Sequence, residues 1–402
     1  MNMNHLLARK KSSSSLRRKQ SGVSSVTPSS TTPSDDKPRE AKSTPYQSAQ
    51  YKILLETKGS FMDEFELGIT KESSSGYQAL LNAERPVPKD SVFRDDLFKS
   101  TCRKIADRNE ARVIQDITRL IVPSAETLVT FGSKPLDILV ESVNEGWDNS
   151  IALTKPRPQP DYAVGFKRTA FTEDQFKKIQ PFIGGFSEIS FFMGTYYMYF
   201  PFLTCEVKCG AAALEVADRQ NAHSATLEVR GVVELFRLVK REKELQREIL
   251  AFSISHDNRM VRIYGHYPVI DGPKTTFYRH PIKEFSFTSE DGKEKWTAYK
   301  FTRNVYDIWM PMHFKRICSV IDELPPDINF EVSELPSSEA SGLSQALEDQ
   351  SLSQQSNADT ASLVGNYDSQ SRLAGSITPN TSLSHGTEQG AFKKPKRRHA
   401  VE

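Results

Sequence analysis

A chain of 402 residues, 37% of them hydrophobic, is long enough to bury one large core or two smaller ones. Its formal net charge of +2 does not indicate a nucleic-acid binder, so any basic surface must be local. Four cysteines are too few for a disulfide scaffold, and the absence of a run of about 18 apolar residues predicts that no segment spans a membrane.

The two ends of the chain have compositions that are typical of disordered segments. Residues 1–45 are rich in Ser, Thr, Lys and Arg, and residues 328–402 are rich in Ser and Gln. Such segments bury too little apolar surface to offset the entropy lost on ordering. The second tail ends in a dense basic cluster formed by Lys393, Lys394, Lys396, Arg397 and Arg398. This cluster predicts a nuclear localisation signal, a nuclear protein and a nuclear import receptor as partner; a solubilising or RNA-binding tail is the alternative.

Between the tails, residues 46–132 are predicted to form a helical extension. Apolar residues recur at helical spacing around Tyr51, over residues 92–108 and over residues 110–121, where Pro123 follows the last helix. Residues 68–89 are punctuated by Ser, Pro and Gly, which favours a loop.

Residues 133–327 are predicted to form the core domain. We expect a helix from Ser133 to about Trp147, a strand over residues 160–166 and a short helix over residues 172–183, capped by Thr172. A strand over residues 199–209 precedes the longest helix, residues 213–239. Three further strands, over residues 250–255, 260–267 and 275–280, lead to a final helix, residues 293–324, which is interrupted near Pro311.

The strand over residues 199–209 carries charge where a buried strand is expected. Side chains alternate between the two faces of a strand, so Glu206 and Lys208 share one face and Cys205 the other. Burying a carboxylate and an ammonium is costly unless they are paired or bind a ligand. Asp161, at the start of an earlier strand, supplies a second carboxylate.

The sequence Pro160-Asp161 followed by Glu206-Val207-Lys208 resembles the signature of the PD-(D/E)XK, or restriction-endonuclease-like, nuclease superfamily. The expected order of helices and strands agrees with that resemblance. It implies an α/β (α+β) fold with a central mixed sheet flanked by helices, and a metal-dependent nuclease, endonuclease or exonuclease, acting on DNA or RNA.

The resemblance also implies roles for these residues. Asp161 and Glu206 would be metal ligands, together with the carbonyl oxygen of Val207, and Lys208 would orient water or stabilise phosphoryl charge. Magnesium fits such a set because it prefers oxygen ligands and needs only one or two carboxylates. The alternative is that Glu206 and Lys208 form an ordinary ion pair and that Asp161 is a turn residue.

Three further residues are additional candidates. Some superfamily members carry a glutamine that faces the metal in the helix after the motif, which Gln220 matches, and His223 shares its helical face. Others carry an extra acid before the first strand, which Glu141 matches. Each residue has an alternative interpretation: Gln220 as an ordinary helix polar residue, His223 as a structural histidine and Glu141 as a solvated helix charge.

Residues 135–325 also resemble a large group of fungal proteins whose function is not established. The phrases that carry this likeness are 199–209, 217–224 and 261–268. We therefore expect a nuclear nuclease, with a catalytically inactive relative that binds nucleic acid or protein as the alternative.

Overall fold

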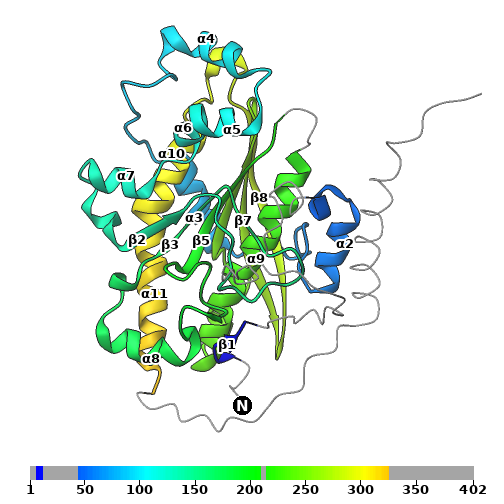
Figure 1. Cartoon of the computed structure of the whole chain (residues 1–402), viewed down its shortest axis with the longest axis vertical. Coiled ribbons are helices and arrows are strands. Elements are labelled where there is room, and N and C mark those ends of the chain that lie inside the picture. The colour runs from blue at the N-terminus through cyan, green and yellow to red at the C-terminus, as the bar shows by residue number, and fades with distance from the viewer. Residues whose placement is uncertain (1–5, 12–43, 210–213, 326–402) are drawn as a thin grey trace, which may run out of the picture. The chain divides into compact units, whose positions relative to one another are not determined.

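The computed structural model describes residues 6–11, 44–209 and 214–325, which are built around a six-stranded mixed sheet (Figure 1). The strands are, in spatial order, β2 (Leu139–Ser142), β3 (Tyr162–Phe166), β5 (Tyr199–Val207), β6 (Ala251–His256), β7 (Met260–Asp271) and β8 (Lys274–Ser286). Strands β5 and β6 are parallel, and every other neighbouring pair is antiparallel. The expected α/β fold, a mixed sheet flanked by helices, is confirmed.

Helices cover both faces of the sheet (Figure 1). Helix α9 (Leu214–Leu238) makes the crossover that the parallel β5–β6 pair requires, and its Asn221 Nδ2 donates to Ser255 Oγ of β6 at 3.0 Å. The other face packs against α10 (Thr297–Asn304) and α11 (Met310–Glu323), which a π-helical turn joins. Phe252 of β6 contacts Phe301 and Trp309 on that side.

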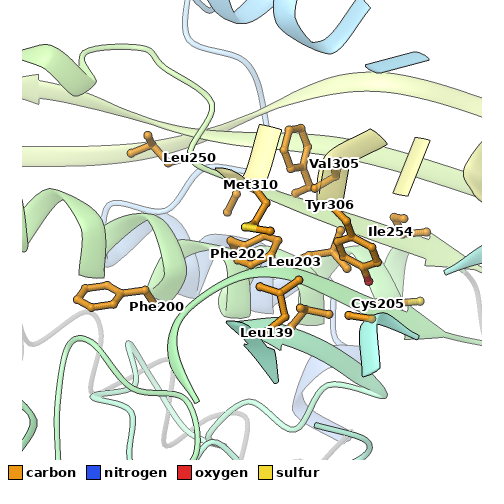
Figure 2. Packing of buried hydrophobic residues seen from close by; sticks show 14 of the residues in the cluster. Leu139, Phe200, Phe202, Leu203, Cys205, Leu250, Ile254, Val305, Tyr306 and Met310 are labelled. Atoms are coloured by element: carbon orange, nitrogen blue, oxygen red, sulfur yellow. The ribbon is translucent and has the colours of Figure 1, made fainter. Parts of the chain in front are cut away.

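The hydrophobic core lies between the sheet and the α10–α11 segment. Figure 2 shows Leu203 and Cys205 of β5 close to Tyr306 and Met310, and none of these four residues is more than 1% exposed. Every residue of β5 is buried, because helices cover the strand on both faces.

Residues 50–130 are largely helical, and most of these helices share this core. Phe93, Ile105 and Ile117 belong to the same hydrophobic cluster as the sheet residues, and the helices predicted over residues 92–108 and 110–121 are confirmed. The helices of this part are α2 (Gln50–Thr57), α3 (Lys71–Asn82), α4 (Asp95–Ile105), α5 (Glu110–Val113), α6 (Arg119–Ile121) and α7 (Ala125–Thr130), with a π-helical turn between α5 and α6.

The loop predicted over residues 68–89 is wrong, because most of it is helix α3. Thr70 caps the helix by accepting a hydrogen bond from the backbone N–H of Ser73 at 3.1 Å. Leu80 is buried, and Asn304 of α10 donates to its carbonyl oxygen at 2.8 Å. Capping and tertiary packing therefore outweigh the low helix propensity of the serines and glycine in this segment.

The helix predicted from Ser133 to Trp147 is also wrong. Residues Lys134–Ile138 form a short 3-10 helix, and the chain then enters β2, which pairs antiparallel with β3. The proline-led turn was identified correctly, but cross-strand pairing takes over after Ile138. Glu141 consequently lies on a strand at the edge of the sheet.

The remaining elements follow the prediction, with differences in length. Helix α8 (Glu173–Ile183) begins with a capping box between Thr172 and Gln175, and α9 and β6 occupy the predicted positions. Strands β7 and β8 are longer than expected, because they pair with each other over nearly their whole length, from Met260 with Ser286 to Asp271 with Lys274. The last helix is divided into α10 and α11, with Pro311 in the first turn of α11.

Part of the segment predicted to be disordered contacts the fold. Leu6 is 2% exposed, and β1 (Arg9–Lys10) pairs with β4 (Glu188–Ile189). Apart from residues 44 and 45, the rest of the two predicted tails, including the basic cluster at residues 393–398, lies outside the described residues. All four cysteines are free. Within the ranges that the structure describes, no helix has the length and apolar character needed to cross a membrane.

Two glycine variants test helix α3 and the packing of α9. Gly76→Ala is expected to raise the free energy of unfolding by up to about 1 kcal/mol, since Gly76 lies within α3 and nothing would contact the added methyl group. Gly231→Ala should lower it by about 1–3 kcal/mol, because its Cβ would lie 2.6 Å from the backbone oxygen of Phe191. Urea denaturation measures both effects; a loop at residue 76 would give no gain.

Candidate active site

Asp161 and Glu206 face each other across two neighbouring strands. Tyr162 of β3 pairs with Cys205 of β5 in antiparallel register, so one step further Asp161 stands opposite Glu206. Asp161 Oδ2 accepts a hydrogen bond from the backbone N–H of Val207 at 2.8 Å. Asp161 is 3% exposed and Glu206 is 1% exposed. The fold therefore brings together the two acids that the sequence separates.

Lys208 joins this pair just beyond the end of β5. Its ammonium donates to the carbonyl oxygen of Val207 at 2.8 Å and lies 3.9 Å from Glu206 Oε2. Glu206 pairs with Ser255 of β6, whose hydroxyl meets α9, so the carboxylate of Glu206 lies on the α9 face of the sheet. Cys205 takes the opposite, hydrophobic face, as alternation along the strand predicted.

A third carboxylate, Glu110, was not identified from the sequence. It begins α5, and its Oε2 lies 3.4 Å from the ammonium of Lys208. Its side chain is 29% exposed, whereas that of Lys208 is 7% exposed, so Glu110 is the partner nearest to solvent. An acid in the first turn of a helix is ordinarily explained by the helix dipole, and no spacing in the sequence links Glu110 to the Glu206-Val207-Lys208 motif.

Glu141, the acid suggested for this position, lies elsewhere. It accepts hydrogen bonds from Tyr162 Oη at 2.6 Å and from Ser124 Oγ at 2.7 Å. Tyr162 in turn meets Tyr306, which packs on the α10–α11 face. Glu141 is thus directed to the face opposite Glu206 and does not join the cluster.

His223 has the environment of a structural histidine. Its Nε2 accepts a hydrogen bond from the backbone N–H of Leu153 at 3.3 Å, while Nδ1 lies 2.9 Å from Tyr46 Oη and 3.1 Å from Tyr51 Oη. Burial, with a smaller contribution from Arg230, lowers the pKa of His223 to about 3. The ring is therefore neutral at pH 7. Its contacts with Tyr46 and Tyr51 hold residues 46–51 against α9.

Gln220 lies one helical turn before His223 and is 8% exposed. Its Oε1 forms no hydrogen bond with the part of the chain that the structure describes. Tyr46 links this region to the acids electrostatically: burial raises the pKa of its hydroxyl, and the charge of Glu206 raises it further. The amide oxygen of Gln220 is therefore buried and still able to accept a hydrogen bond.

The side chains near Lys208 are oxygen-rich. Cys209 follows directly, but burial and the charges of Glu110 and Asp257 raise the pKa of its thiol to about 12, so no thiolate is present at neutral pH. Within the described ranges, no group of three or more His, Cys, Asp or Glu side chains is arranged to hold a metal ion. A divalent ion would have to rely on Asp161, Glu206, a backbone carbonyl and water.

A family model described as "Domain of unknown function (DUF7924)" matches residues 97–321. This span covers the whole sheet and the four residues Glu110, Asp161, Glu206 and Lys208, and it begins after α2 and α3. Neither a curated protein nor a solved structure gives a match.

The pH dependence of stability tests the role of His223. Its pKa is about 3 in the folded chain and 6.5 as the ordinary value, so between these pH values the unfolded chain binds the extra proton. Stability is therefore lost as the pH falls from 6.5 towards 3, by up to about 1.4 kcal/mol per pH unit for one such group. His223→Gln should flatten this slope when urea denaturation is compared at pH 7 and pH 5. An unchanged slope would mean that the ring is already protonated in the fold.

Proposed function

We propose that this chain is a metal-dependent phosphodiesterase that acts on DNA or RNA in the nucleus. The chain belongs to the DUF7924 family, whose model matches residues 97–321, more than half of its length. The observation that carries the proposal is the meeting of Asp161, Glu206 and Lys208 at the ends of two adjacent strands. Two carboxylates beside one ammonium are the groups that the PD-(D/E)XK signature requires.

The oxygen donors of this cluster fit a magnesium ion. Asp161 and Glu206 would provide two carboxylates on one face, and Val207, which directly follows Glu206, would provide the carbonyl oxygen that now accepts from Lys208. Magnesium keeps several waters and needs only one or two carboxylates, so a third acidic ligand is not required. When bound, the ion would offset the negative charge of the phosphate and polarise it towards attack.

The chain's own residues would perform the remaining tasks. Two carboxylates alone repel a phosphate, and the ammonium of Lys208 offsets part of that repulsion. Lys208 is held by the Val207 carbonyl and by Glu110, so its ammonium is positioned beside Glu206 before substrate arrives. From there the ammonium can donate a hydrogen bond to a phosphoryl oxygen or to the attacking water. Gln220, whose buried amide oxygen forms no hydrogen bond with the described residues, would help to orient that water.

Exposure indicates the side from which substrate would enter. Glu110 is the most exposed member of the cluster, while Asp161 and Glu206 are almost fully buried. A phosphodiester would therefore approach past α5 and displace Glu110 from Lys208. Substrate binding would therefore require the Lys208–Glu110 ion pair to break, and a phosphate would replace the Glu110 carboxylate as the partner of the Lys208 ammonium.

A specific observation favours a second function, that of a catalytically inactive fold that binds nucleic acid or protein. The ammonium of Lys208 already has three oxygen partners inside the chain. A fully partnered buried charge is also what a purely structural ion network would show. The two functions differ in whether the cluster turns over a substrate.

A cleavage assay on the full chain separates the two functions. Plasmid DNA and single-stranded RNA are incubated with MgCl2 or MnCl2, and with EDTA as the blank. Asp161→Asn and Lys208→Ala should each lower the cleavage rate by about 100-fold or more, because each removes a charge that acts on the transition state. Lys177→Ala, which removes a lysine of α8 with a 75% exposed side chain, is the matched control and should cleave at the wild-type rate.

Thermal unfolding of the same variants shows whether a slower cleavage rate comes from loss of the fold. Asp161→Asn should stay folded, since asparagine keeps the shape of the side chain and an oxygen that can accept from the Val207 N–H. Variants that stay folded and cleave as fast as the wild type would exclude this cluster as the site. A wild-type chain that binds either polymer and never cleaves it would establish the inactive fold instead.

The nuclear part of the proposal rests on the basic cluster at residues 393–398. Replacing Lys393, Lys394, Lys396, Arg397 and Arg398 by alanine should abolish nuclear accumulation of the full chain fused to a fluorescent protein, because an import receptor recognises the clustered charges. The control replaces Arg17, Arg18 and Lys19, a basic cluster in the first predicted tail, by alanine. If nuclear accumulation survives the change at residues 393–398 and is lost with the change at residues 17–19, the signal lies in the first tail.

A further inference from the structure

A hollow of about 520 Å³ lies apart from the candidate active site. The loop after β2 contributes Glu145 and Asp148, the turn after α8 contributes Phe186, and the segment before β5 contributes Thr195, Tyr196 and Tyr197. None of the residues that line it belongs to the cluster around Lys208. Its volume falls within the range of sites that bind small molecules or peptide side chains.

Hydrogen bonds and ring contacts hold the walls of this hollow in place. Asn149 is 3% exposed, and its Nδ2 donates to the carbonyl oxygens of Phe186 at 3.1 Å and Glu188 at 2.9 Å. The rings of Phe186 and Tyr196 meet edge to face at 5.9 Å, and those of Tyr196 and Tyr197 at 4.8 Å. Tyr197 also donates to Glu145. The site is therefore formed before any ligand arrives.

The aromatic rings are exposed to an unusual degree for their size. Phe186 is 81% exposed and Tyr196 is 55% exposed. Large aromatic side chains that remain open to solvent beside a hollow are typical of recognition surfaces. Two carboxylates stand among them, so the surface combines aromatic faces with negative charge.

A second, independent observation points to a ligand. Thr195 lines the hollow and is 5% exposed, yet its Oγ1 forms no hydrogen bond with any residue that the structure describes. A buried hydroxyl without a partner costs free energy, and a polar group that reached it would lower that cost. Because a threonine hydroxyl both donates and accepts, it favours a polar ligand without selecting a donor or an acceptor.

A cationic side chain meets all of these requirements. The faces of aromatic rings attract ammonium and guanidinium groups, carboxylates pair with them, and their N–H groups donate to a hydroxyl oxygen. Phosphate-bearing ligands are disfavoured, since the carboxylates of Glu145 and Asp148 outnumber the one cation of the lining, Lys11. We propose that this hollow binds the lysine or arginine side chain of a basic peptide.

The N-terminal strand shows how such a side chain reaches the hollow. Lys11 lines it directly after β1, and its backbone N–H donates to the carbonyl oxygen of Ser187 at 3.3 Å. An extended basic segment, Arg9–Lys10, thus runs along β4 and leads to a lysine at the hollow. A peptide ligand would present its cations from an extended backbone in the same way.

Fluorescence anisotropy on the full chain tests the proposal. The probe is a fluorescein-labelled peptide of four Lys-Gly repeats, and the comparison peptide carries acetyl-lysine in place of lysine. We expect the lysine peptide to bind and the acetylated peptide to bind at least tenfold more weakly, because acetylation removes the charge and leaves the stem. Equal binding of the two peptides, or no binding of the lysine peptide up to about 1 mM, would overturn the proposal.

Matched variants then separate cation–π recognition from general charge attraction. Tyr196→Leu combined with Phe186→Leu should weaken binding about tenfold while the net charge is unchanged, and Tyr196→Phe should retain it because the ring remains. Glu145→Gln with Asp148→Asn should weaken binding by a similar factor. Phe131→Leu is the control, since Phe131 is 83% exposed and does not line the hollow. Leucine variants that bind within twofold of the wild type would show that the rings are not the site.

Discussion

The structure depends on one constraint: β5 is buried on both faces and yet carries Glu206 near its end, with Lys208 directly after it. Removing an ammonium and a carboxylate from water costs several kcal/mol for each ion unless good partners replace the water. Lys208 finds those partners in Glu206, in the Val207 carbonyl and in Glu110 of α5. The pairing of this ammonium with Glu110 thus joins α5 to the end of the sheet, in addition to the hydrophobic contacts of Val113 and Ile117.

Much of this arrangement was predictable from local patterns. The period-two alternation around Cys205, Glu206 and Val207 predicted which face carries charge, and the cap at Thr172 predicted where α8 begins. Helix α3 was missed because its caps and its contact with Asn304 are tertiary features that outweigh weak local propensity. Strand β2 was missed because apolar residues of a short edge strand also fit a helical period until the pairing with β3 is known.

The candidate site shows the same limit. Asp161 and Glu206 could be paired from the sequence because a known signature joins them, whereas Glu110 has no such link and is brought to Lys208 by the fold alone. The exposed rings at Phe186 and Tyr196 gave no signal either, since single aromatic residues in loops are common. Sites built from several separate loops become visible only when their walls are placed in space.

The contacts between residues 46–51 and α9 have a practical consequence. Tyr46 and Tyr51 close over His223 from a part of the chain that precedes the family-matched span, and their apolar surfaces pack on Val216 and Ala222. A recombinant fragment of residues 97–321 would expose this side of α9. His223 would lose the hydroxyl groups of Tyr46 and Tyr51, and the apolar side chains of Val216 and Ala222 would face water. Fragments intended for crystallisation should therefore begin no later than residue 44, where the covering segment starts.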